Sequence, residues 1–273
     1  MRKRKKHCYI EKKYRTIAEK ILESVRLHDR LIGNWQSDIG SRISYEFSFN
    51  EEIGQEPDNI FKPLEEKFLS VKSVTLREGL LLGLWDGAYS VCWSHEGNAA
   101  CTDEAKNAED KRIYDSSKKY CDKYDKMLLD ILSQGRGFEY NGDSFRLRAH
   151  QGDKYDEYMI VIGVDYTVNG ESFTAECAVS DETIEAVCYW ENFLLEEQEE
   201  FCYNFIDYYD DDHKFLSFNA EKTDDGINVT VTLFDEKGIH EFKNCMSRNR
   251  YYEFVNFFTI IRIVLLDSRR CWL

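Results

Sequence analysis

Two short segments of the sequence combine residue types that could bind a metal ion. The first is CWSHEGNAAC, residues 92–101, in which Cys92, His95 and Cys101 follow one another at the spacing C-x2-H-x5-C. Structural zinc sites usually have four ligands arranged as two close pairs. Cys92 and His95 could form one pair, but the segment offers no second pair. We therefore predict no cofactor here: Cys92 is a small core residue and residues 94–98 form a polar turn.

The second segment is DYYDDDH, which carries four aspartates and a histidine within residues 207–213. Clustered carboxylates can hold Mg²⁺ or Ca²⁺, but calcium loops need a glycine at the sharp bend and a distal glutamate, and this segment has neither. We predict instead a solvated acidic loop between a helix and a strand, which attracts a basic protein partner. Exposed tyrosines there would supply anchor area at low entropy cost. The predicted partner-binding residues are Asp207, Tyr208, Tyr209, Asp210, Asp211 and Asp212.

Sequence motifs give little support for catalysis. The chain contains no G-x-S-x-G, no H-E-x-x-H and no G-x-x-x-x-G-K-[ST] phosphate loop. The residues therefore favour a binding protein over an enzyme; the enzyme alternative is a metal-assisted hydrolase that uses His95 or His213 with neighbouring carboxylates. A third alternative follows from Gly33-Asn34-Trp35, which is similar to the G-x-W motif that opens lipocalin-type barrels. That similarity implies a barrel-like protein that binds a small ligand.

The charge of the chain is strongly negative and unevenly distributed. Lys and Arg number 36 and Asp and Glu 51, which gives a net charge of −15. The first fifteen residues hold eight basic side chains against one acidic, a local charge of +7, so the remainder carries −22. We expect such a body to repel nucleic-acid phosphates and membrane surfaces and to attract basic molecules. The predicted partner is accordingly a basic protein, with no nucleic acid and no membrane bound.

The sequence also carries information on the compartment. No apolar segment follows the basic start, and nine scattered cysteines, odd in number, are typical of reduced thiols. The most apolar segment, residues 251–266, is sixteen residues long, whereas a bilayer needs about twenty. We therefore expect this segment to be a helix buried in a protein core, and the protein to be cytoplasmic.

The hydrophobic pattern of the first half of the chain predicts both helices and strands. Apolar residues at helical spacing predict an opening helix that Gly33 ends, and strict alternation in RISYEFSF predicts a half-buried strand. Glu78-Gly79 and Asp86-Gly87 are interpreted as breaks between further strands. The predicted elements are a helix at 11–31, a strand at 42–49, a short helix at 58–70 with Pro63 in its first turn, two or three strands within 73–93, and a helix at 104–132.

Turn residues punctuate the second half more clearly. Asn141-Gly142 and Asn169-Gly170 predict tight hairpins, and Asp225-Gly226 and Lys237-Gly238 predict two more turns. The run INVTVTLF alternates throughout, as expected of a sheet with one buried face. The second half therefore contains two groups of strands, each followed by a helix. These helices are predicted to start at Ser180 and near Ser247. The predicted fold class is α+β, with antiparallel meander sheets and helices packed on one face.

The order of these elements supports a division of the chain and a family resemblance. We predict a helix-rich α+β region at 1–135 and an α+β domain at 136–273, or one continuous domain. A family resemblance is carried by two segments, VDYTVNGESFTAECAVSDETIEAV and LSFNAEKTDDGINVTVTLF. Over residues 158–266, the order of the predicted elements resembles that of immunity proteins of bacterial polymorphic toxin systems. That resemblance implies an intracellular acidic binder that neutralises a toxin by docking, without catalysis.

Overall fold

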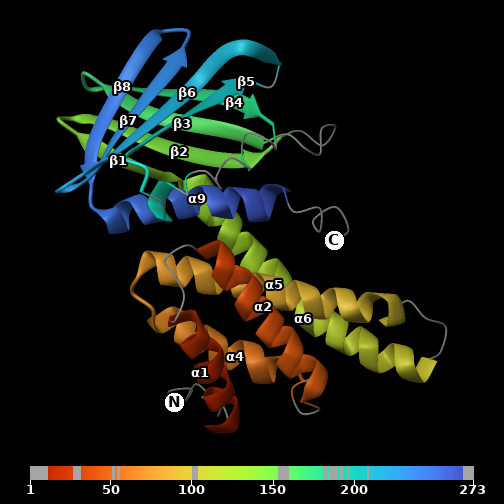
Figure 1. Ribbon diagram of the computed structural model, residues 1–273. Helices are drawn as coiled ribbons and strands as arrows, with labels where there is room; N and C mark the ends of the chain where they lie inside the picture. The colour runs from red at the N-terminus through yellow and green to blue at the C-terminus, as the bar shows by residue number, and fades with distance from the viewer. Residues whose placement is uncertain are drawn as a thin grey trace, which may run out of the picture. The chain divides into compact units, whose positions relative to one another are not determined.

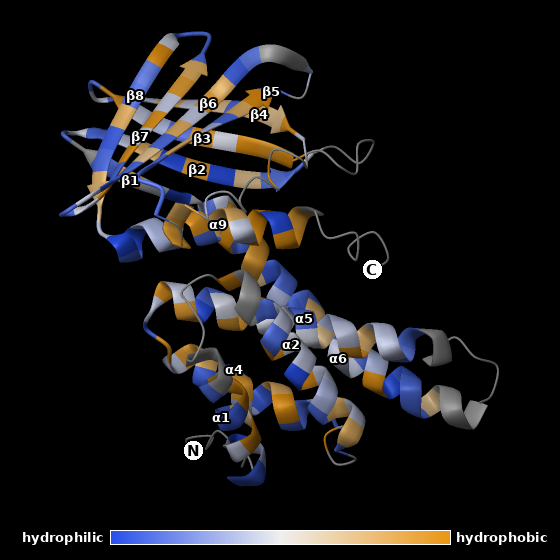
Figure 2. Cartoon of the chain, viewed as in Figure 1, coloured by the Kyte–Doolittle hydropathy of each residue, from blue (hydrophilic) through white to orange (hydrophobic). Residues whose placement is uncertain are grey.

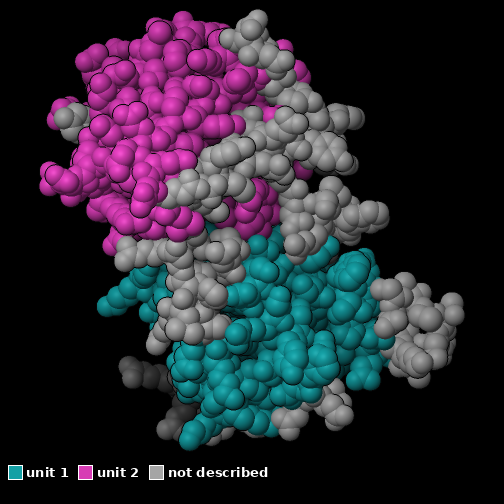
Figure 3. Space-filling model, viewed as in Figure 1, with its two compact units in different colours: residues 1–126 teal, residues 127–273 magenta. Residues whose placement is uncertain are grey.

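A computed structural model describes residues 12–26, 32–50, 53, 56–99, 104–152, 160–180, 184, 190, 193–195, 197–207 and 209–266. These residues form helices in the first half of the chain, and two four-stranded antiparallel sheets with a further helix in the second (Figure 1). The predicted α+β class with antiparallel meanders is confirmed. Two compact units divide the chain, unit 1 at residues 1–126 and unit 2 at residues 127–273, coloured separately in Figure 3.

Unit 1 is built from helices. They are α1 (Lys12–Arg26), α2 (Ile32–Phe49), α4 (Asp58–Ser70), α5 (Val74–Ala99) and α6 (Glu104–Gln134), the last of which contains the unit boundary. The helices predicted at 58–70 and 104–132 are confirmed, and the helix predicted at 11–31 is confirmed over Lys12–Arg26, the part of it that the structure describes. Pro63 is the sixth residue of α4 and not in its first turn, and its side chain is buried.

The strands predicted at 42–49 and within 73–93 are wrong, because both segments are helical. The alternating apolar residues of 42–49 divide between two sides of α2: Ile43 and Phe47 are buried, while Tyr45 and Phe49 are exposed. Gly33 lies inside α2 and ends no helix. Since Gly33-Asn34-Trp35 is helical and opens no strand, the similarity to lipocalin-type barrels loses its basis.

Two glycines of α5, Gly83 and Gly87, allow α2 and α5 to approach closely, and the predicted strand break at Asp86-Gly87 is wrong. A Cβ added to Gly83 would lie 2.4 Å from the Cβ of Ile39, and one added to Gly87 would lie 2.7 Å from the Cδ1 of Ile43. A Cβ added to Gly40 of α2 would likewise lie 2.0 Å from a carboxylate oxygen of Asp86 on α5. Residues four apart on one helix therefore meet residues four apart on the other, in the same order, so the helices run parallel.

Unit 2 contains two meander sheets. The first has the order β1 (Arg136–Tyr140), β2 (Asp143–Gln151), β3 (Ile160–Val168), β4 (Glu171–Val179), and the second β5 (Glu200–Asp207), β6 (Asp210–Thr223), β7 (Gly226–Asp235), β8 (Gly238–Met246). The predicted hairpins are confirmed. Asn141 and Asn169 have φ of 52° and 53°, followed by glycines at 90° and 82°, as a tight two-residue turn requires.

The core of unit 2 lies between the inner faces of the sheets and helix α9 (Arg248–Leu266). Phe218 of β6 contacts Phe145 of β2, with ring centroids 6.3 Å apart, and Phe258 of α9 at 5.9 Å. Figure 2 shows apolar and polar residues alternating along the strands and apolar residues over much of α9. The buried helix predicted at 251–266 is confirmed. Among the described residues, no helix combines the length and apolarity needed to cross a bilayer.

The edge strand β1 is protected by side chains from elsewhere in unit 2. The Asn244 side-chain amide donates to the carbonyl of Glu139 at 3.5 Å, and the Arg250 guanidinium donates to the carbonyl of Gly137 at 3.1 Å. Such contacts block the pairing of an edge with a foreign strand. The helix predicted from Ser180 falls mostly outside the described residues; Ile184, Trp190 and 193–195 are helical there.

Candidate protein-binding surface

Two turns lie at the same end of the second sheet, because β5, β6, β7 and β8 form a continuous antiparallel meander. We call this region, residues 206–213 and 234–240, the turn end. An aspartate closes the strand before each turn and accepts a hydrogen bond from the backbone N–H two residues later. Asp207 Oδ1 accepts from Tyr209 at 2.8 Å, and Asp235 Oδ1 accepts from Lys237 at 2.9 Å. This geometry is the Asx-turn, in which the side chain replaces a backbone acceptor.

Asp235 also joins the turn end to the first sheet. The Tyr166 hydroxyl of β3 donates to Asp235 Oδ2, and His240 Nε2 lies 3.4 Å from Oδ1. Burial alone would raise the pKa of Asp235, but hydrogen bonds from Tyr166 and from the backbone of Lys237 outweigh it and lower the pKa. Burial and the hydrogen bond to Asp235 raise the pKa of Tyr166 to about 12. The cluster therefore holds an ionised carboxylate and a neutral phenol at neutral pH.

Asp207 makes a comparable link through β4. Burial, together with the neighbouring Asp207 carboxylate, raises the pKa of the Cys177 thiol to about 12, because a thiolate there would be desolvated and would face a like charge. Asp207 is thus half-buried and engaged in shaping its turn. It is less available to a partner than the sequence prediction assumes.

The remaining predicted partner-binding residues are only partly described. Tyr209 is 72% exposed, whereas Tyr208 and the side chains of Asp210, Asp211 and Asp212 fall outside the described residues. The acidic segment spans the end of β5, the turn and the start of β6, so the prediction of a loop that joins a helix to a strand is wrong. Strand β5 was missed because its outward positions mix glutamate, cysteine and asparagine with one isoleucine.

Exposed apolar side chains accompany the acidic residues of the turn end. Ile239 is 70% exposed and pairs across the strands with Phe234, while Ile206 is 37% exposed on β5. Together with Tyr209 they give this end of the sheet apolar contact area beside negative charge. The aspartate immediately before each turn is the sequence signal that could have found Asp235. Tyr166 could not have been found, since 69 residues separate it from Asp235.

Net charge differs sharply between the two units. Unit 1 contains 23 basic and 22 acidic side chains, a net charge of +1, whereas unit 2 contains 13 basic and 29 acidic side chains, a net charge of −16. Unit 2 therefore carries the whole negative balance of the chain. A field of this sign raises the encounter rate with cationic molecules.

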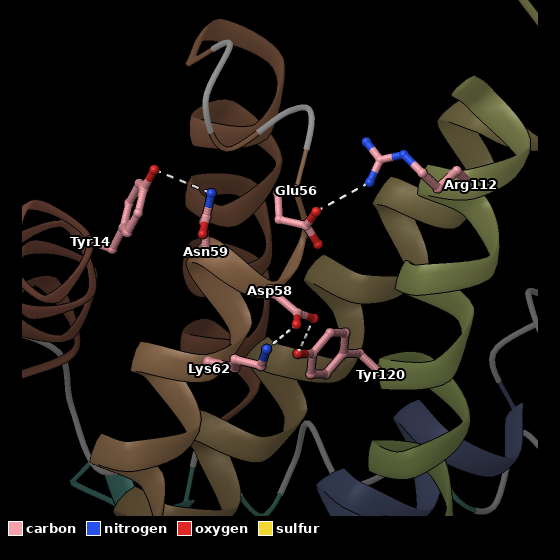
Figure 4. A network of polar contacts seen from close by, with 7 residues as sticks. All are labelled: Tyr14, Glu56, Asp58, Asn59, Lys62, Arg112 and Tyr120. Atoms are coloured by element: carbon pink, nitrogen blue, oxygen red, sulfur yellow. Dashed lines mark hydrogen bonds and ion pairs between the residues drawn. The ribbon is translucent and has the colours of Figure 1, made fainter. Parts of the chain in front are cut away.

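Polar groups in unit 1 pair with one another and mainly hold its helices together. Asp58 of α4 accepts hydrogen bonds from Lys62 and from the Tyr120 hydroxyl of α6, and Arg112 lies 3.2 Å from Glu56 (Figure 4). Burial alone would raise the pKa of Asp58, but these hydrogen bonds lower it; burial and Asp58 raise the pKa of Tyr120. Such a network needs no ligand to satisfy it.

The metal candidates do not converge in the part of the chain that is described. Cys92 is buried in α5, its thiol 3.9 Å from the Tyr114 carbonyl, and burial raises its pKa. His95 Nδ1 lies 2.6 Å from Asp110 of α6. Cys101 lies outside the described residues, and among those described no three His, Cys, Asp or Glu side chains form a metal-binding group. Cys92 is a core residue as predicted, but residues 94–98 belong to a helix and form no turn.

Comparison with known proteins identifies no relative for the chain. No family model matches it, and no curated protein matches its sequence. A solved structure of the plant transcriptional regulator PBF-2 is similar over 50% of this chain and 84% of its own, with 7% identity and a TM-score of 0.32. The structure of WHY1 from Arabidopsis thaliana is similar over 50% and 88%, with 8% identity and a TM-score of 0.31. Likeness at this level supports no conclusion about function.

Proposed function

We propose that the chain is a protein-binding module that docks a basic protein partner on the turn end of unit 2. The observation that carries this proposal is the exposure of Tyr209, Ile206 and Ile239 beside an aspartate-rich turn. Tyrosine is enriched among the residues that dominate binding energy, because its large, rigid side chain loses little conformational entropy when it is fixed at an interface. Negative charge around it would steer a cationic partner and fix its orientation.

The predicted contact residues take different roles in this proposal. Asp207 sets the backbone of the β5–β6 turn through its bond to the Tyr209 N–H. Tyr209 supplies the anchor, with Tyr208 beside it in sequence. The charges of Asp210, Asp211 and Asp212 supply attraction. The resemblance to immunity proteins extends the proposal: the partner would be a toxin, neutralised by docking in the cytoplasm.

A labelled octa-lysine peptide tests the location of the site. The variant that changes Asp207, Asp210, Asp211 and Asp212 to Asn should weaken binding at low ionic strength at least tenfold in fluorescence anisotropy. The matched control changes four acidic residues at the opposite end of the same sheet, Glu200→Gln, Glu221→Gln, Asp224→Asn and Asp225→Asn, and thus removes the same charge. Equal losses in both variants would show that the peptide senses net charge alone and would reject the turn end as the site.

Tyr209→Ala tests the anchor independently of charge. Loss of an exposed aromatic anchor should speed dissociation, with little change in the association rate, because steering depends on charge and not on the ring. Stopped-flow measurements at several salt concentrations separate the two rates. An association rate indifferent to ionic strength would contradict the electrostatic part of the proposal.

A further inference from the structure

The β7–β8 turn places a lysine of the chain itself on an aromatic ring of the first sheet. The Lys237 ammonium lies 3.6 Å from the ring centroid of Phe173 on β4. Other lysines over rings are more distant, at 4.8 Å for Lys222 over Phe193 and 4.9 Å for Lys13 over Tyr14. The face of Phe173 thus accepts an ammonium at close contact. A cation in this position is attracted by the negative face of the ring.

The ring is held firmly, whereas the lysine is not. Phe173 packs against Tyr166 with centroids 5.3 Å apart, and Tyr166 is 1% exposed and bonded to Asp235. Lys237 is exposed, and its backbone is fixed by Asp235. Within the described part of the chain, its ammonium makes no ion pair with a carboxylate. The ring is therefore a preformed platform, and the lysine side chain can leave it at low cost.

Two glutamates accompany this platform, one next to Lys237 in the sequence and one on the same strand as Phe173. Glu236 adjoins Lys237 in the turn, and Glu171 lies on the same face of β4 as Phe173, two residues before it. Both are exposed. An aromatic face combined with nearby negative charge is the chemistry that receives the side chain of lysine or arginine.

We infer that the face of Phe173 is a subsite for a lysine or arginine side chain of the basic partner, and that Lys237 occupies this subsite in the unbound protein. The inference rests on the proposed function and names one contact within it. Lys237 then acts as an internal competitor, which the partner must displace. Removing Lys237 should raise affinity by more than the loss of one positive charge explains.

Binding of labelled octa-lysine to Lys237→Met and Lys243→Met tests this competition. Lys243 is a matched control, because it lies on the same hairpin, is exposed, and pairs with Glu241 at 2.8 Å. Among the described residues, no aromatic ring lies beneath its ammonium. An exposed cation–π contact is worth about 0.5–1 kcal/mol, so Lys237→Met should bind about two- to fivefold more tightly than Lys243→Met. Equal affinities of the two variants would overturn the inference.

Phe173→Leu keeps an apolar side chain on β4 but removes the aromatic face. In this background, Lys237→Met should gain no more affinity than Lys243→Met. If octa-lysine binding depends on the turn aspartates while Phe173→Leu leaves the advantage of Lys237→Met intact, the subsite is wrong and the proposed function stands. If binding ignores the turn aspartates, the proposed function fails first.

Nuclear magnetic resonance of the unchanged protein gives a test that needs no variant. The ε-methylene protons of Lys237 adjoin the ammonium that lies over the Phe173 ring and should therefore be shifted upfield. Saturation with octa-lysine should return these signals toward the position of a solvated lysine, because the peptide takes the place on the ring. An upfield shift that persists in the saturated complex would overturn the inference.

Discussion

At the scale of single residues, aspartate does more structural work in this protein than the sequence indicates. Asp207 belongs to an acidic cluster that the sequence marks as exposed, yet its carboxylate accepts the Tyr209 N–H and lies against Cys177. Asp235 lies in a segment without any such cluster, and it joins a turn to the first sheet through Tyr166. Composition reveals where charge accumulates. Which carboxylate is buried depends on the packing of two sheets, and local sequence does not encode that packing.

Tyr166→Phe should therefore destabilise unit 2 by removing one donor to the Asp235 carboxylate. Hydrogen bonds to charged groups contribute about 1.5–3 kcal/mol, so we expect a loss of that size in the free energy of unfolding at pH 7. The folded pKa of Asp235 is lowered, so its contribution is present above the unfolded pKa near 3.9 and is lost as the pH falls toward the folded value.

The difference in the free energy of unfolding between the wild type and Tyr166→Phe should accordingly become smaller below about pH 4.5. Urea unfolding followed by tryptophan fluorescence at several pH values measures it. Tyr45→Phe removes a hydroxyl from a side chain that is 61% exposed and serves as the control. A gap that widens on acidification would contradict the assigned role of Asp235.

At the scale of elements, turn chemistry is predictable, whereas the distinction between helix and strand is not always. The hairpins at Asn141-Gly142 and Asn169-Gly170 follow from positive φ, a property of the residues themselves. In RISYEFSF, the buried residues Ile43 and Phe47 are four apart, a spacing that a strand of period two and a helix share. Gly87 resembles a strand break in the sequence because its role, close contact with Ile43 of α2, involves a residue about forty positions away.

Gly83→Ala tests the close contact between α2 and α5. Alanine favours a helix interior over glycine by about 1 kcal/mol, which alone would stabilise α5. The new Cβ, however, would lie 2.4 Å from Ile39 Cβ and force the helices apart. We expect a net loss of about 1–3 kcal/mol in the free energy of unfolding, measured by chemical denaturation. Ser48→Ala on the exposed side of α2 is the control, and a gain in stability for Gly83→Ala would refute the assigned packing.

At the scale of the whole molecule, the two units differ clearly in net charge, and the composition of the whole chain does not show this difference. The sequence alone gives −15, but only the boundary at residue 126 shows that one unit is close to neutral and the other carries −16. The sequence predicts a division at residue 135, or one continuous domain, whereas the compact units divide at residue 126, inside α6. A helix that passes through a unit boundary leaves no mark in the local pattern.

Self-repulsion within unit 2 should make the stability of the chain depend on salt. Glu200 and Glu221 lie directly opposite each other on β5 and β6, and both are exposed, a pairing that destabilises a sheet. Raising NaCl from 10 to about 300 mM screens such repulsion, so the midpoint of thermal unfolding should rise.

Glu221→Gln should raise the free energy of unfolding at low salt by about 0.2–1 kcal/mol and reduce the gain in stability from added salt. Glu253→Gln removes the same charge from an ion pair with Arg250, at 2.7 Å, and should bring no such gain. Equal shifts for the two variants would show that total charge, and not the pairing of the two strands, governs the stability of unit 2.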